Sequence, residues 1–154
     1  MKRFTLIILV LSFALLSACT STPQPAAQQS TTGTAASLVV SGGEVNKSYT
    51  RANLEALSTT QAAFKDVTYM GVTVSDLLTD AGFDPAAVKA VKAVAADGFT
   101  VNYDPSQVLG KDVIVAYARV DGDLAEEDGS FRMVLPGAEG KLNLRMLVEL
   151  QVIK

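Results

Sequence analysis

The stretch from Tyr69 to Gly82, YMGVTVSDLLTDAG, constrains the fold more than any other part of this sequence. Apolar side chains recur at helical spacing from Val74 to Ala81, and Gly82 follows where a left-handed C-terminal cap belongs. We therefore predict that a strand ends at Tyr69, that the chain turns at Gly71, and that a short amphipathic helix follows.

Strand-like runs lie on both sides of this stretch. Ser37–Ser41 is rich in valine and stops at Gly42-Gly43, which predicts a bend or hairpin turn. The run AAVKAVKAVAA is ambiguous, because its alanines favour a helix while its valines and the following Asp97-Gly98 favour a strand entering a hairpin. We predict a strand over Ala90–Ala96. Further strands are predicted at Gln61–Tyr69, Phe99–Tyr103, Asp112–Val120, Arg132–Leu135 and Val148–Ile153.

Short helical segments connect the predicted strands. Thr50 can cap a helix over Arg51–Leu57, and helical turns are expected at Pro85–Val88 and Pro105–Leu109. Together the elements predict a β-rich α+β domain with a mixed sheet over residues 37–154. About 118 residues are enough for a single core.

The residue types that are missing limit the chemistry. The sequence contains no histidine, no tryptophan and one cysteine. These absences exclude Ser-His-Asp and Cys-His catalysis, histidine-ligated metal sites and an intrachain disulfide. We therefore predict no catalytic and no metal-binding residues, and the sequence favours a role other than catalysis.

The N-terminal segment has the features of a bacterial lipoprotein signal peptide. A basic start at Lys2 and Arg3 precedes an apolar run of about 13 residues, which is short for a membrane span but suits a signal peptide. The run ends in LSAC, which resembles a lipobox. An ordinary signal peptide and a signal anchor are the alternatives. We predict that residues 1–18 are removed and that Cys19 is acylated, for example with palmitate, which holds the protein at the cell membrane or outer membrane outside the cytoplasm.

Residues 19–36 are predicted to be the acylated cysteine and a disordered tether. Thr20–Ala36 is uncharged and has no large apolar side chain, so it cannot bury enough surface to offset the entropy of ordering. Removal of the signal peptide changes the formal net charge from −3 to −5. This charge disfavours nucleic acid, so the predicted partners are membrane lipid, through Cys19, and an envelope protein.

The globular part resembles a known family through an ordered series of motifs. LVVSG is followed by YT..NLEAL, Y.GV..SDLL..AG, A.DGF.V.Y, VIVAYA..DG..L and FRMVLPG..G.L. This order is similar to a short, stand-alone molybdopterin-binding domain of the sulfite oxidase type, over roughly Leu38–Ile153. The resemblance implies that family's fold, and it is the only reason to consider molybdopterin as a cofactor.

The resemblance also identifies what this sequence lacks. Enzymes of the family hold molybdenum through the pterin and one protein cysteine, in a segment that corresponds here to Leu57–Tyr69. That segment, LSTTQAAFKDVTY, contains no cysteine, and the hydroxyls of Ser58, Thr59 and Thr60 are poor substitutes for a thiolate. The larger N-terminal part that completes the pterin pocket, with its histidine and arginines, is also missing. We therefore expect the fold without the cofactor chemistry.

Three residues are candidates for facing a ligand. Arg132 and Lys141 match basic positions of the family's R-L-V-x-P-G…G-K segment, and Asp97 matches its Asp-Gly turn; a strand flank, a solvated loop and a hairpin turn are the structural alternatives. An acidic run also invites a calcium hypothesis, but Ala125 and Glu126 stand where an EF-hand places an oxygen ligand and glycine. A solvated loop is therefore favoured for that run, whose acidic members are Asp121, Asp123, Glu126, Glu127 and Asp128.

Three functions are compatible with the sequence. The first is a non-catalytic, membrane-anchored binding or interaction module. The second is an accessory subunit of a molybdopterin-dependent oxidoreductase, in which a partner chain completes the site. The third is a receptor for a small molecule or peptide. Metal content separates the first two, and ligand-induced stabilisation tests the third.

Overall fold

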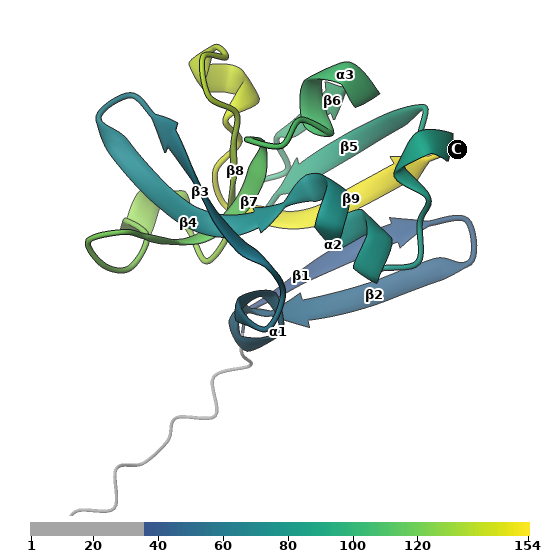
Figure 1. Cartoon of the computed structure of the whole chain (residues 1–154), viewed down its shortest axis with the longest axis horizontal. Coiled ribbons are helices and arrows are strands. Elements are labelled where there is room, and N and C mark those ends of the chain that lie inside the picture. The colour runs from purple at the N-terminus through teal and green to yellow at the C-terminus, as the bar shows by residue number, and fades with distance from the viewer. Residues whose placement is uncertain (1–35) are drawn as a thin grey trace, which may run out of the picture. The chain divides into compact units, whose positions relative to one another are not determined.

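The computed structural model describes residues 36–154, which form two β-sheets with short helices packed around them (Figure 1). Within these residues no helix is long and apolar enough to cross a membrane. The predicted signal peptide, Cys19 and almost the whole predicted tether lie outside the described residues. The β-rich α+β class predicted from the sequence is confirmed, but with two sheets where we expected one.

The first sheet has five strands in the order β2-β1-β9-β5-β6. Its central strand, β9, pairs in parallel with β1 and antiparallel with β5, which makes the sheet mixed. The N-terminal and C-terminal strands of the domain are therefore neighbours. The strands of this sheet are β1 (Ser37–Gly42), β2 (Val45–Thr50), β5 (Ala90–Ala95), β6 (Thr100–Tyr103) and β9 (Leu147–Ile153).

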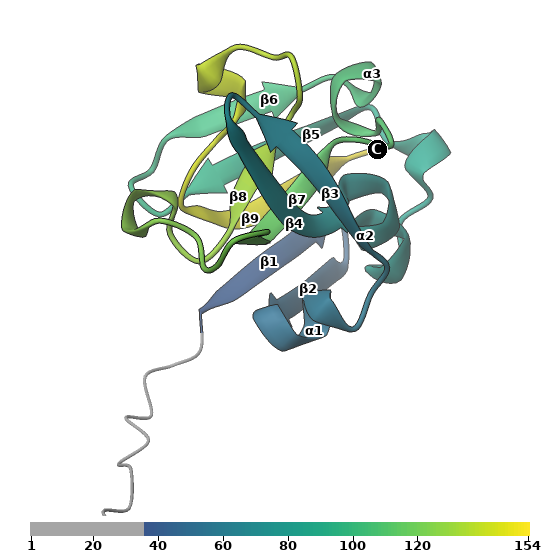
Figure 2. The same cartoon turned by 60° about the vertical axis from the view of Figure 1, so that its left-hand side comes forward.

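The second sheet has four antiparallel strands in the order β3-β4-β7-β8. β7 lies between two neighbours, and its first five residues are all buried, as expected for the most strand-like run in the sequence. In Figure 2 the β3–β4 hairpin crosses in front of the five-stranded sheet. The strands are β3 (Thr59–Phe64), β4 (Val67–Thr73), β7 (Ile114–Arg119) and β8 (Arg132–Val134).

The helices are short, and several of them begin at a side-chain cap. In α1 (Arg51–Glu55), the Thr50 hydroxyl accepts a hydrogen bond from the Asn53 amide and the Asn53 side chain accepts one from the Thr50 amide. In α2 (Val74–Asp80), Thr73 is the N-cap, and the chain leaves the helix at Gly82 with φ of +93°. The others are α3 (Pro105–Val108) and the 3-10 helices η1 (Pro85–Ala87), η2 (Glu126–Asp128) and η3 (Gly140–Leu142).

The main core lies between the two sheets. Leu38 and Leu150 of the five-stranded sheet, Val115 of the four-stranded sheet and Leu77 of α2 are all fully buried in it. A second, smaller cluster covers the opposite face of the four-stranded sheet, where the buried residues are Ala62, Tyr69, Ile114, Ala116 and Val134. Polar groups gather at the end of this second face.

Three local predictions were wrong, and one strand, β2, was missed. The strand predicted to end at Tyr69 continues as β4 to Thr73. Gly71 does not form a turn: it lies inside β4 at a bulge, where an added Cβ would lie 2.8 Å from the Cα of Ala116 in β7. Gln61–Tyr69 is not one strand, because the chain reverses at Lys65, which has φ of +54°, and so separates β3 from β4. β2 was missed because its middle residues are polar and exposed, as an edge strand allows.

Candidate functional site

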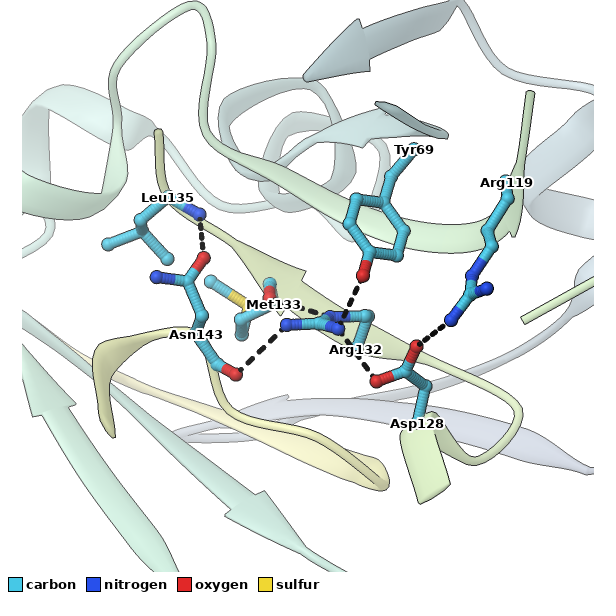
Figure 3. A network of polar contacts seen from close by, with 7 residues as sticks. All are labelled: Tyr69, Arg119, Asp128, Arg132, Met133, Leu135 and Asn143. Carbon is cyan, nitrogen blue, oxygen red and sulfur yellow. Dashed lines mark hydrogen bonds and ion pairs between the residues drawn. The ribbon is translucent and has the colours of Figure 1, made fainter. Parts of the chain in front are cut away.

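The polar network in Figure 3 centres on Arg132, the first residue of β8. Its Nη1 donates hydrogen bonds to Oδ1 of Asp128 at 2.6 Å and to the hydroxyl of Tyr69 at 2.8 Å. Asp128, the last residue of η2, is only 2% exposed, and Arg132 is 4% exposed. A buried charge of this kind is stable only when it is paired, and this pair satisfies that condition.

The rest of the Arg132 guanidinium is also occupied. Its Nε and Nη2 donate to the backbone carbonyl oxygens of Met133 and Asn143, both at 3.4 Å. The Asn143 side chain accepts a hydrogen bond from the Leu135 amide at 2.7 Å, which ties the segment after β8 to the network. The guanidinium carbon also lies 4.6 Å from the centre of the Tyr69 ring, in cation–π geometry.

A second arginine, Arg119, reaches the same carboxylate from the end of β7. Its Nη2 lies 3.4 Å from Oδ2 of Asp128, so the two arginines contact different oxygens of one carboxylate (Figure 3). Its Nε is buried and has no hydrogen-bond partner among residues 36–154. A buried donor without a partner is unusual in native proteins, and it marks the point where this network is incomplete.

A cavity of about 400 Å³ adjoins this network. Lys65 from the β3–β4 turn and Arg145 from the segment before β9 line it together with Arg119 and Arg132. Its acidic lining residues are Glu127 and the already paired Asp128. In the part of the chain that the structure describes, Lys65 and Arg145 form no ion pair. The lining therefore has a surplus of positive charge, which favours an anionic ligand.

The structure places the three candidate residues in two neighbouring cavities. Arg132 lines the cavity described above but is buried and paired, whereas Asp97 and Lys141 line an adjacent cavity of about 360 Å³. Lys141 is exposed and pairs with Glu139 at 2.9 Å, which raises the pKa of Lys141 and lowers that of Glu139. The Asp97 carboxylate accepts a hydrogen bond from the Phe99 amide, as a turn residue would.

The acidic run does not assemble a cation site. Asp128 turns inward to the two arginines, and Asp123 pairs with Arg51 at 2.6 Å. Among residues 36–154 no three histidine, cysteine, aspartate or glutamate side chains group together as metal ligands. The calcium hypothesis therefore receives no support from the geometry.

The structure also allows a test of whether a molybdenum centre fits. The segment Leu57–Tyr69 folds mainly as the β3–β4 hairpin, and its Phe64, Lys65 and Tyr69 side chains line the cation-rich cavity. The Thr59 hydroxyl is hydrogen-bonded to that of Tyr117 at 2.9 Å, and no thiol occurs in the described residues. The residues present therefore do not fit a metal centre that is held through a protein thiolate.

A second large cavity, of about 430 Å³, lies away from this network. It lies between α1 and the segment that precedes β8, and Tyr117, Leu124 and Phe131 give it a mainly apolar wall. The exposed Arg51–Asp123 ion pair is also part of its lining. Its chemistry suits a neutral, largely apolar group, in contrast to the cation-rich cavity.

Sequence reasoning did not identify most of the network. Arg119, Asp128 and Asn143 come from separate elements, and nothing in the sequence indicates that they meet. Tyr69 was interpreted as an amphipathic sheet residue, and the structure confirms this while adding the contact of its ring with Arg132. Only the position of Arg132 in the motif FRMVLPG gave a signal.

Comparisons with known proteins agree on the fold. A family model described as "Oxidoreductase molybdopterin binding domain" matches residues 28–154. The solved structure of the sulfane dehydrogenase SoxCD from Paracoccus pantotrophus is similar to this chain, with a TM-score of 0.64 and 22% sequence identity. That match covers 76% of this chain but 38% of the SoxCD chain, and at this identity it shows the fold alone. Among curated proteins no match is found.

Proposed function

This chain belongs to the family of oxidoreductase molybdopterin-binding domains, and from that premise we propose that it is a non-catalytic member, anchored to a membrane by lipid, that acts as a binding or interaction module. The observation that carries the proposal is the β3–β4 hairpin. The resemblance places the metal-binding cysteine in this segment, and the side chains here offer hydroxyl, amide, apolar and charged groups but no thiolate.

The cation-rich cavity supports a binding role. It lies at the end of the hairpin, and its lining keeps Lys65 and Arg145 free of ion pairs within the described residues. A volume of about 400 Å³ falls in the range of small-molecule sites. A module of this kind holds a ligand or a partner's acidic group by charge and shape, and needs no metal.

The test is the metal content of protein purified from its native host. We expect molybdenum far below one atom per chain and no pterin fluorescence after oxidative release. Stoichiometric molybdenum or a fluorescent pterin would refute the non-catalytic role. The same measurement on protein stripped of co-purifying chains by denaturing wash and refolding is the control, because metal lost with those chains is not held by this domain.

The lipid anchor is the second part of the proposal. It is supported by the LSAC sequence at Leu16–Cys19 and by the uncharged segment that follows. In this arrangement the domain faces away from the cytoplasm, at the cell membrane or the outer membrane. Mass spectrometry of the mature N-terminus checks it: a peptide that begins at Cys19 and carries acyl chains is expected, and an unmodified N-terminus contradicts it.

An alternative function is an accessory subunit of a molybdopterin-dependent oxidoreductase. It is supported by the family match, because a domain of a molybdopterin-binding family can contribute to a site that a second chain completes. Crosslinking in native membranes followed by mass spectrometry distinguishes the two functions. Recovery of an oxidoreductase chain crosslinked through Lys65 or Lys141 supports the accessory role, and recovery of none supports the independent module.

A further inference from the structure

Arg132, which the resemblance marks as a ligand-facing cation, faces a carboxylate of its own chain. Both of its Nη atoms and its Nε donate hydrogen bonds within the domain, and its ionic partner is Asp128 at 2.6 Å. Asp128 therefore occupies the position next to Arg132 that an anionic ligand would take.

Two guanidinium groups converge on the Asp128 carboxylate. Arg132 contacts Oδ1 and Arg119 contacts Oδ2, and the Asp128 side chain is 3% exposed. Arginine pairs around one group are a common way to bind an oxyanion, because each guanidinium presents several donors in a plane. We call Arg119 and Arg132 the two-arginine site.

The carboxylate fills the two-arginine site incompletely. The contact of Arg119 is long, at 3.4 Å, and the Nε of the same residue is buried without a partner. A carboxylate has two oxygens, and both are already directed at the guanidinium groups. A tetrahedral oxyanion has further oxygens and can offer an acceptor to the donor that is left over.

The backbone of Asp128 is held independently of its side chain. Its amide donates to the Ala125 carbonyl at 2.9 Å, and its carbonyl accepts from the Met146 amide at 2.8 Å. Loss of the carboxylate should therefore leave η2 in place, and Arg132 keeps its hydrogen bonds to Tyr69, Met133 and Asn143.

We propose that Asp128 is an intramolecular counter-ion that occupies an oxyanion site formed by Arg119 and Arg132, and that this site accepts a free tetrahedral oxyanion once the carboxylate is removed. The inference rests on the proposed function. In a non-catalytic member of the family, a carboxylate of the same chain can occupy the arginine that would otherwise face a ligand. In the native protein, anions are left with the outer cations Lys65 and Arg145.

The experiment is thermal unfolding of detergent-solubilised, metal-free, full-length protein in inorganic phosphate, at ionic strength held constant with chloride. Wild type, Asp128→Ala and Asp121→Ala are compared. Asp121→Ala is the matched control, because it removes the same charge from an exposed position in the same loop. General stabilisation by phosphate affects all three proteins alike and is subtracted in this way.

We expect a saturable rise in Tm only for Asp128→Ala, of about 5 °C at ten times the dissociation constant of phosphate. The rise should disappear in the double variant Asp128→Ala/Arg119→Gln. The proposal is overturned if Asp128→Ala responds like Asp121→Ala. It is also overturned if wild type itself shows a saturable response that Arg119→Gln abolishes.

If Asp128→Ala does not fold in chloride, the same protein is diluted from urea into phosphate or chloride and native circular dichroism is followed. Recovery in phosphate alone supports the proposal, and recovery in neither solution refutes it. The anion response is read on metal-free protein, whereas the proposed function is judged by molybdenum content. Either can therefore fail without the other.

Discussion

Replacement of Arg132 by methionine should destabilise the domain strongly. Methionine keeps much of the side-chain length, but it removes the guanidinium that donates hydrogen bonds to Asp128 and to the Tyr69 hydroxyl and lies over the Tyr69 ring. The Asp128 carboxylate then stays buried with only the 3.4 Å contact of Arg119. Removing one partner of a buried ion pair typically costs about 3–5 kcal/mol.

That cost is a large part of the total stability, which is about 5–15 kcal/mol for a domain of this size. In urea denaturation, with an m value of about 2 kcal/mol/M, the midpoint should fall by about 2 M. The slope should stay unchanged, because the surface exposed on unfolding is nearly the same. The Arg119 side chain is 28% exposed, so water can solvate its guanidinium if the Asp128 carboxylate moves or is replaced.

The double variant Asp128→Leu/Arg132→Met tests the reasoning behind that magnitude. It leaves no unpaired carboxylate, and apolar replacement of a buried ion pair is often neutral or stabilising. We expect the double variant to be more stable than Arg132→Met alone, with a coupling energy of at least about 2 kcal/mol. A cost below about 1 kcal/mol for Arg132→Met, or additive costs in the double variant, would refute the view that this pair is desolvated.

Three further predictions concern other parts of the chain. Gly71→Ala should cost about 3 kcal/mol or more in urea denaturation, because its Cβ would clash with the backbone of β7; Gly140→Ala, which meets no atom within 4 Å, is the control and should change little. Hydrogen bonds from Lys47 and Tyr49 lower the pKa of Asp80, so stability should be lost as pH falls below its ordinary value of 3.8. Between about pH 6 and pH 3, Asp80→Asn should therefore lose less stability than wild type, and an equal loss contradicts the assignment. Cys19→Ala should abolish incorporation of labelled palmitate into the protein, and label retained by the variant would argue against acylation at Cys19.

Elements with a strong local pattern were predictable from the sequence. The helix after Thr73 has its cap, its apolar stripe and its terminal glycine within ten residues, and α2 begins and ends within one residue of the prediction. β7 was predictable because its first five residues form a continuous apolar run. Such a run indicates a strand that is buried on both faces, even though apolar and polar residues do not alternate in it. Both cases depend on neighbours in the sequence.

Features that depend on distant neighbours were not predictable. Gly71 looks like a turn residue, but the requirement for glycine comes from the backbone of β7, more than 40 residues away in the sequence. The reversal at Lys65 uses a residue type with no turn signature. In the site, the sequence indicated Arg132 but not its partner Asp128, which looked like one more acid in a solvated loop. Burial distinguishes it from its neighbours, and burial is a property of the folded chain.

The position of β9 in the middle of the five-stranded sheet sets the moment at which this protein can fold. Among the described strands β9 comes last along the chain, and it lies between two hairpins, β1–β2 and β5–β6, which it joins into one sheet. Pairs such as Val39 with Glu149 close a loop of more than 100 residues, which makes folding slow and late. Without β9, the five-stranded sheet is divided into these two separate hairpins. The order of strands along this chain therefore makes completion of the five-stranded sheet depend on the segment farthest in sequence from β1.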